Sequence, residues 1–202
     1  MTRKSVFRER KRSYSDRPVG NITPKERFLI VCEGAKTEPN YFRSFRVPKD
    51  VIDVRGIGAN TVDVVEKAIE LKDKDNYDQV WCVFDRDSFP ATNFNAAFVL
   101  ANRNNIKIAY SNEAFEIWYL LHFHYYDTGM SRKQYGAKLT ECLGHKYEKN
   151  STTIYEEILE MQSRAIKNST DLLATYNPVN PERDNPSTKV HCLVEELNKF
   201  IS

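Results

Sequence analysis

Phe28-Leu29-Ile30-Val31-Cys32-Glu33-Gly34 is an unbroken apolar run that stops on an acidic residue and a glycine. A second run of the same kind, Gln79-Val80-Trp81-Cys82-Val83-Phe84, stops on Asp85-Arg86-Asp87. Runs without a polar interruption are typical of strands that are buried on both faces, as in a parallel sheet covered by helices. The two runs therefore predict two core strands of one sheet, each ending on carboxylates.

Shorter strands and amphipathic helices alternate with these runs. Val51–Val54 has the composition of a short strand, and Asn60 or Thr61 can cap the helix that follows it. A helix over about residues 94–103 precedes another apolar strand, Ile106–Tyr110. Strands and helices that alternate at this spacing predict an α/β domain with helices on both faces of a parallel sheet.

The second half of the chain has a helical pattern. We expect helices over residues 113–123, 131–143 and 153–167, and a last helix after Asn185-Pro186-Ser187. The stretch 168–185 is rich in Asn and Pro and predicts a loop. These elements predict a helical part that packs on the α/β core.

The chain divides by composition into a basic flexible arm over 1–24, an α/β core over 25–125 and a helical part over 126–202. The first twenty positions hold seven basic residues against two acidic ones, although the net charge of the whole chain is only +2. A basic arm can bind nucleic-acid phosphates through release of counterions. A solvated tail without a ligand is the alternative interpretation.

The sequence favours a cytoplasmic protein without a membrane anchor. Its apolar runs have the length of strands, so no transmembrane span is expected, and the N-terminus lacks the apolar segment of a signal peptide. Four cysteines are scattered without a Cys-x-x-Cys pair, which favours reduced thiols.

Three carboxylates follow the two central strands: Glu33, Asp85 and Asp87. Ligands of open α/β sheets bind beyond the carboxyl ends of the strands, and residues two apart on an extended segment point the same way. Mg²⁺ or Mn²⁺ is held by such hard oxygen ligands, with water and phosphate completing the shell. Lys36 is placed to neutralise a phosphate or the acidic cluster. The alternative is that these acidic residues only cap turns.

These motifs resemble the TOPRIM domain of topoisomerases, primases and OLD-type nucleases, in which one strand ends in Glu-Gly and another in Asp-x-Asp. More narrowly, three blocks resemble the RloB family, in the same order and over about residues 28–200. The blocks are Leu29–Phe42 (LIVCEGAKTEPNYF), Ser111–Phe123 (SNEAFEIWYLLHF) and Asn185–His191 (NPSTKVH). Ala114 and Glu113 depart from the expected Cys and Pro of the second block.

The resemblance implies a compact TOPRIM-like α/β fold in a bacterial or archaeal phage-defence system, often encoded beside an ATPase. We therefore expect a metal-dependent nuclease that hydrolyses phosphodiester bonds of RNA or DNA. Glu33, Asp85 and Asp87 would bind the metal, Lys36 would neutralise charge, and Glu116 would be a fourth ligand or a general base. The alternative for Glu116 is an exposed residue that stabilises a helix N-terminus.

Other functions remain open at this level. A regulatory module that binds nucleic acid or an ATPase without cutting is the main alternative, and nucleotidyl transfer is a third. The chain lacks a GxxxxGK[ST] phosphate loop, so ATP hydrolysis would require a partner. Cys142 and His145 with His191 and Cys192 could form a zinc site. The sequence also leaves open a homodimer.

Overall fold

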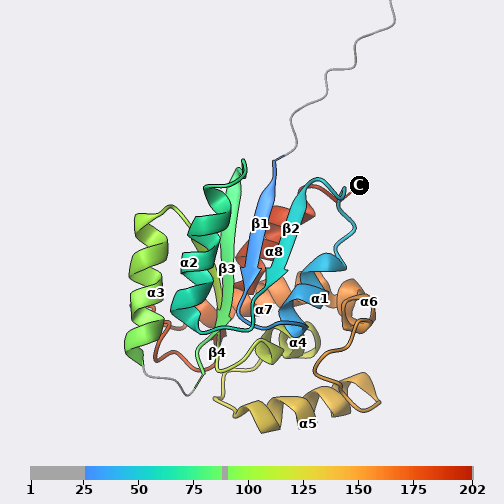
Figure 1. Cartoon of the computed structure of the whole chain (residues 1–202). Helices are drawn as coiled ribbons and strands as arrows, with labels where there is room; N and C mark the ends of the chain where they lie inside the picture. The colour runs from blue at the N-terminus through green and yellow to red at the C-terminus, as the bar shows by residue number, and fades with distance from the viewer. Residues whose placement is uncertain (1–25, 88–90, 202) are drawn as a thin grey trace, which may run out of the picture.

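The computed structural model describes residues 26–87 and 91–201, and a five-stranded sheet lies at its centre (Figure 1). The strands are β1 (Phe28–Cys32), β2 (Ile52–Gly56), β3 (Gln79–Asp85), β4 (Lys107–Asn112) and β5 (Ser187–Thr188). Their order across the sheet is β2-β1-β3-β4-β5. The first four strands are parallel and β5 pairs antiparallel with β4. The predicted TOPRIM-like α/β fold is confirmed.

Helices cover both faces of the sheet. They are α1 (Thr37–Arg43), α2 (Thr61–Lys72), α3 (Ala91–Arg103), α4 (Glu116–Phe123), α5 (Arg132–Leu143), α6 (Ile154–Ile158), the 3-10 turn η1 (Leu159–Met161), α7 (Gln162–Ala174) and α8 (Val190–Asn198). Helices α2 and α3 cover one face, and α1, α4, α7 and α8 lie on the other (Figure 1).

The alternation of side chains along β1 explains why its sequence is apolar throughout. Phe28, Ile30 and Cys32 point into the larger cluster, which they share with α1, α4, α7 and α8. Leu29 and Val31 point into the second cluster, under α2 and α3. Successive side chains of a strand face opposite sides of the sheet, so a strand between two helical layers requires an apolar residue at every position.

The parallel strands end at one edge of the sheet, and this edge is where the predicted site falls. In the register of β1 and β3, Cys32 is paired with Val83, so Glu33 lies beside the end of β3. Asp85, the last residue of β3, is paired with Ser111 of β4. Helix α5 lies just beyond these strand ends (Figure 1).

Two predictions about the helical part are wrong. The expected helix 153–167 is divided into α6, η1 and α7, and α7 continues to Ala174 through a segment predicted as part of the loop 168–185. Asn168 is tolerated within α7 because its side-chain amide donates to the carbonyl of Leu121, 2.8 Å away. A polar side chain that is satisfied by a neighbouring helix does not end its own helix.

The junction after β4 also differs from the prediction. Helix α4 begins at Glu116 and not at Glu113, because Asn112 is still part of β4, where it pairs with Ser187. Strand β5 was not predicted: it has only two residues, which is too short for a hydrophobic alternation. The last helix begins at Val190, after this strand.

The basic arm 1–24 lies outside the residues that the structure describes. The division of the rest at residue 125 stays a prediction, although residues from both sides contribute to the larger core cluster. Within residues 26–87 and 91–201, none of the helices combines the length and the apolar character that a membrane span requires.

Candidate functional site

Glu33 and Asp85 meet at the ends of the two central strands. The side-chain Oε2 of Glu33 accepts a hydrogen bond from the backbone N–H of Asp85, at 3.1 Å. Oε1 of Glu33 lies 3.5 Å from the hydroxyl of Thr61, the first residue of α2. The parallel pairing of β1 with β3 therefore brings together two of the carboxylates predicted to bind a metal.

Asp85 and Asp87 point to the same side, as the two-residue spacing predicted. Both carboxylates approach one guanidinium nitrogen, Nη2 of Arg132, at 3.3 Å from Asp85 Oδ2 and 3.7 Å from Asp87 Oδ2. Arg132 is the first residue of α5, and a capping box formed by Ser131 and Gln134 fixes the start of this helix. The sequence did not indicate Arg132 as part of the site.

Glu38 is a further carboxylate at this edge that the sequence analysis missed. It lies in the first turn of α1 with 6% of its surface exposed. Its Oε2 and the Oδ1 of Asp85 are both buried without a hydrogen-bond partner among the described residues. Its spacing of five residues from Glu33 and its place in the block Leu29–Phe42 were the signals available in the sequence. The helix start between Glu33 and Glu38 turns the Glu38 side chain back toward Gly34 and the strand ends.

Glu116 joins the same cluster, whereas Lys36 does not. Glu116 opens α4 with 8% of its surface exposed, and the phenol of Tyr147 donates to its Oε1 at 3.3 Å. It is therefore buried, contrary to the alternative of an exposed residue at a helix N-terminus. Lys36 is exposed, and its amine forms no ion pair with any residue that the structure describes. We call the carboxylates of Glu33, Glu38, Asp85, Asp87 and Glu116 the acidic site.

Burial and mutual repulsion raise the pKa values of three of these carboxyls. For Glu33 the pKa rises to about 7, first through burial and then through the charges of Asp87 and Glu38. Burial also raises the pKa of Asp85 well above its ordinary range, with Glu38 and Glu116 adding to the effect. The pKa of Glu38 is raised for the same reasons. A cation at this site would oppose both the effect of burial and the repulsion between the carboxylates, because an opposite charge favours the ionised form.

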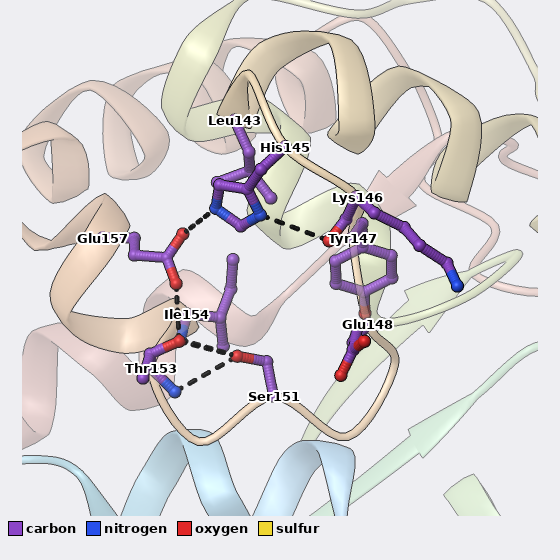
Figure 2. Close-up of a pocket in the computed structure, with 9 residues that line it drawn as sticks. All are labelled: Leu143, His145, Lys146, Tyr147, Glu148, Ser151, Thr153, Ile154 and Glu157. Atoms are coloured by element: carbon purple, nitrogen blue, oxygen red, sulfur yellow. Dashed lines mark hydrogen bonds and ion pairs between the residues drawn. The ribbon is translucent and has the colours of Figure 1, made fainter.

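A cavity of about 230 Å³ lies between the end of α5 and the start of α6, and Tyr147 forms part of its wall (Figure 2). His145 contacts Glu157 at 2.7 Å, and Thr153 donates to the other oxygen of the same carboxylate at 2.6 Å. The α5–α6 loop, residues 144–153, is also tied to α1, because Thr37 donates to the carbonyl of Lys149 at 2.8 Å. These contacts hold the loop that places Tyr147 against Glu116.

The donor set of the acidic site fits a divalent cation such as Mg²⁺ or Mn²⁺. All of its donors are carboxylate oxygens, and two of these oxygens are buried and unpartnered by the described residues, on Glu38 and Asp85. Across residues 26–87 and 91–201, no group of three or more His, Cys, Asp or Glu side chains has the arrangement of a metal site. Mg²⁺ commonly takes only one or two protein carboxylates, with water and phosphate filling its shell.

The zinc alternative receives no support from the described residues. Cys142 faces the hydroxyl of Tyr126 at 3.9 Å, and His145 pairs with Glu157. His191 and Cys192 contact each other at 3.4 Å on α8. No group of three ligands includes them within the described part of the chain.

Comparison with protein-family models matches the RloB-like protein family over residues 28–197. Comparison with curated proteins and with solved structures gave no match. The matched segment runs from the first residue of β1 into α8 and contains every carboxylate of the acidic site. The chain therefore belongs to the RloB-like family.

Proposed function

We propose that this protein is a Mg²⁺- or Mn²⁺-dependent nuclease that hydrolyses phosphodiester bonds of RNA or DNA in defence against phage. The observation that carries the proposal is the pair of buried carboxylate oxygens, Glu38 Oε2 and Asp85 Oδ1, that have no described partner within the acidic site. Leaving buried carboxylates unpaired is costly. A cation that binds at this edge, where ligands of α/β sheets bind, would offset the cost of several buried carboxylates.

The carboxylates of the acidic site would have different roles in the reaction. Glu33, Asp85 and Asp87 would hold the metal, and Glu38 would be a further ligand. A bound divalent cation lowers the pKa of water and offsets the charge that develops on the phosphate. Glu116, oriented by Tyr147, would accept the proton of the attacking water. The water oxygen would then form a bond to phosphorus while the bond from phosphorus to the leaving oxygen breaks, and the leaving oxygen would take up a proton from solvent.

Further predicted partners belong to this proposal. The nucleic acid is the substrate, and the family resemblance implies an ATPase partner encoded nearby. A homodimer and a cytoplasmic location stay predictions from the sequence.

A cleavage panel tests the function directly. The full chain would be incubated with tRNA, plasmid DNA, and single-stranded RNA and DNA, in Mg²⁺, Mn²⁺ or EDTA. Asp87→Asn would be run beside Asp73→Asn, which removes one negative charge from an exposed position at the end of α2. We expect cleavage that requires the metal, is lost in Asp87→Asn and is retained in Asp73→Asn.

Two results would oppose the proposal. Binding of nucleic acid without cleavage in any metal would favour the alternative of a non-cleaving regulatory module. Cleavage that persists in EDTA or in Asp87→Asn would show that the acidic site is not the catalytic centre.

A further inference from the structure

Arg132 brings a positive charge to the acidic site from a part of the chain outside the sheet. Its Nη2 lies 3.3 Å from Asp85 Oδ2 and 3.7 Å from Asp87 Oδ2. Charge-assisted hydrogen bonds between guanidinium and carboxylate groups are typically about 2.7–2.9 Å long. The contact therefore consists of one long hydrogen bond to Asp85 and a longer ion pair with Asp87, and it can be exchanged for another.

The guanidinium also has capacity for a second ligand. An arginine has five N–H donors arranged in a planar fork. Within the described part of the chain, Arg132 donates one hydrogen bond, from Nη2 to Asp85, and none from Nε or Nη1. Its side chain is 39% exposed, whereas those of Asp85 and Asp87 are 13% and 17% exposed. Arg132 thus lies at the mouth of the site, between its carboxylates and the solvent.

Asp85 and Asp87 offer the same oxygens to Arg132 that they would offer to a metal. A cation bound by both carboxylates neutralises them and repels the guanidinium beside it. The displaced guanidinium stays within a side chain's length of the site, because its backbone is fixed at the first turn of α5. A phosphodiester bound at the metal would then offer the guanidinium another anion, and its geometry suits a guanidinium fork.

We propose that Arg132 binds the phosphate of the nucleic acid at the cleavage site, and that it neutralises Asp85 and Asp87 until a divalent cation displaces it. The inference rests on the proposed function and deepens it. It assigns phosphate recognition to a residue of the helical part, in place of the Lys36 expected from the sequence.

The test compares Arg132→Gln with Lys133→Gln. Both variants remove one positive charge from consecutive positions of α5, but Lys133 is exposed and forms no ion pair with a described residue. Melting temperature is measured against Mn²⁺ concentration. We expect the half-saturating Mn²⁺ concentration to fall by about threefold or more in Arg132→Gln, because a competing charge is removed, and to stay unchanged in Lys133→Gln.

The same variants are then titrated with a fluorescein-labelled single-stranded RNA and its DNA equivalent in Ca²⁺, over a series of salt concentrations. We expect Arg132→Gln to lower the affinity by about fivefold and to reduce the salt slope by about one, as for the loss of one phosphate contact. Arg132→Lys keeps the positive charge but not the planar fork, so its nucleic-acid affinity should lie between those of wild type and Arg132→Gln.

The outcomes separate this inference from the proposed function. If wild type shows no Mn²⁺-dependent shift, the metal site is wrong and the role of Arg132 falls with it. If wild type responds to Mn²⁺ but Arg132→Gln and Lys133→Gln behave alike, only the role of Arg132 is wrong. Tighter Mn²⁺ binding with unchanged nucleic-acid affinity in Arg132→Gln would also overturn phosphate recognition.

Discussion

The carboxylate of Glu38 lies against the Cα of Gly34, where a methyl group would come within 2.0 Å of Glu38 Oε2. A side chain at position 34 would therefore displace the Glu38 carboxylate, which occupies that space. The glycine that follows β1 and the first turn of α1 are therefore two parts of one arrangement. It keeps a buried carboxylate at the carboxyl edge of the sheet.

Gly34→Ala should displace Glu38 and weaken the acidic site while preserving the fold. We expect at least a tenfold loss of Mn²⁺ affinity, of the size expected for a disturbed ligand shell, with a parallel loss of cleavage. Gly136→Ala is the matched control, because its new methyl group would meet only an ordinary contact, 3.9 Å from Tyr147. Mn²⁺-dependent melting and the cleavage assay measure both effects. Unchanged Mn²⁺ affinity in Gly34→Ala would argue against Glu38 as a ligand.

Asp85→Asn should separate stability from activity. The change removes one charge from a buried cluster, so the melting temperature in EDTA should stay level or rise, whereas Mn²⁺ affinity and cleavage should fall steeply. An aspartate with a merely structural role would behave oppositely, since its loss would lower stability by about 1–3 kcal/mol. Thermal melts with and without Mn²⁺ would be run beside the cleavage assay. A variant that melts lower in EDTA yet stays active would contradict the catalytic role.

The pKa of Glu33 predicts how stability depends on pH without metal. Because folding raises this pKa from an ordinary value of 4.5 to about 7, the folded state binds a proton more tightly than the unfolded one. The stabilisation is fully present at low pH and is lost as the pH rises from about 4.5 through 7. In EDTA, the melting temperature of Glu33→Gln relative to that of wild type should therefore increase as the pH rises between these values.

Mn²⁺ provides the control for this pH dependence. The cation binds the ionised carboxylate, so the Mn²⁺-induced shift of wild type should grow as the pH rises through about 7. Glu33→Gln should show a smaller dependence. If wild type and Glu33→Gln keep the same difference in melting temperature at every pH in EDTA, the raised pKa does not belong to Glu33.

The central strands could be predicted from the sequence because a strand between two helical layers must be apolar at each position. Their parallel pairing then determined the edge at which Glu33 and Asp85 would meet. Strand β5 could not be predicted in this way, since it is held by a tertiary contact between Thr188 and Ser111, whose hydroxyls lie 3.0 Å apart. Two residues carry no detectable alternation.

The site was predictable where its residues follow the strands directly or, like Glu116, begin the helix after β4. Arg132 and Tyr147 reach the acidic site from α5 and from the loop after it. Their positions depend on how the helical part packs on the strand ends, which no local pattern encodes. Lys36 is the opposite case: it is close to Glu33 in sequence, but its side chain is exposed and does not join the acidic site.

Deleting residues 1–20 should weaken nucleic-acid binding and reduce its dependence on salt. Basic residues outnumber acidic ones by seven to two in this segment, which lies outside the described part of the structure. Each phosphate contact that is lost lowers the slope of log affinity against log salt by about 0.7–0.9. Fluorescence anisotropy over a salt series measures the slope, and the melting temperature should not change. Equal slopes for the two chains would show that the arm does not bind phosphate.

Tyr147→Phe should lower cleavage with little effect on stability. The substitution keeps the aromatic ring, which packs edge-on against Tyr119 with centroids 6.3 Å apart, and removes the phenol that donates to Glu116 at 3.3 Å. At this distance the hydrogen bond should contribute about 1 kcal/mol, so the melting temperature should fall only slightly. Without the phenol to orient the Glu116 carboxylate, the cleavage rate should fall about three- to tenfold. The Mn²⁺ affinity should be nearly preserved. Tyr125→Phe, which alters an exposed tyrosine, is the control. If both variants cleave like wild type, Glu116 acts without Tyr147 or does not take part in the reaction.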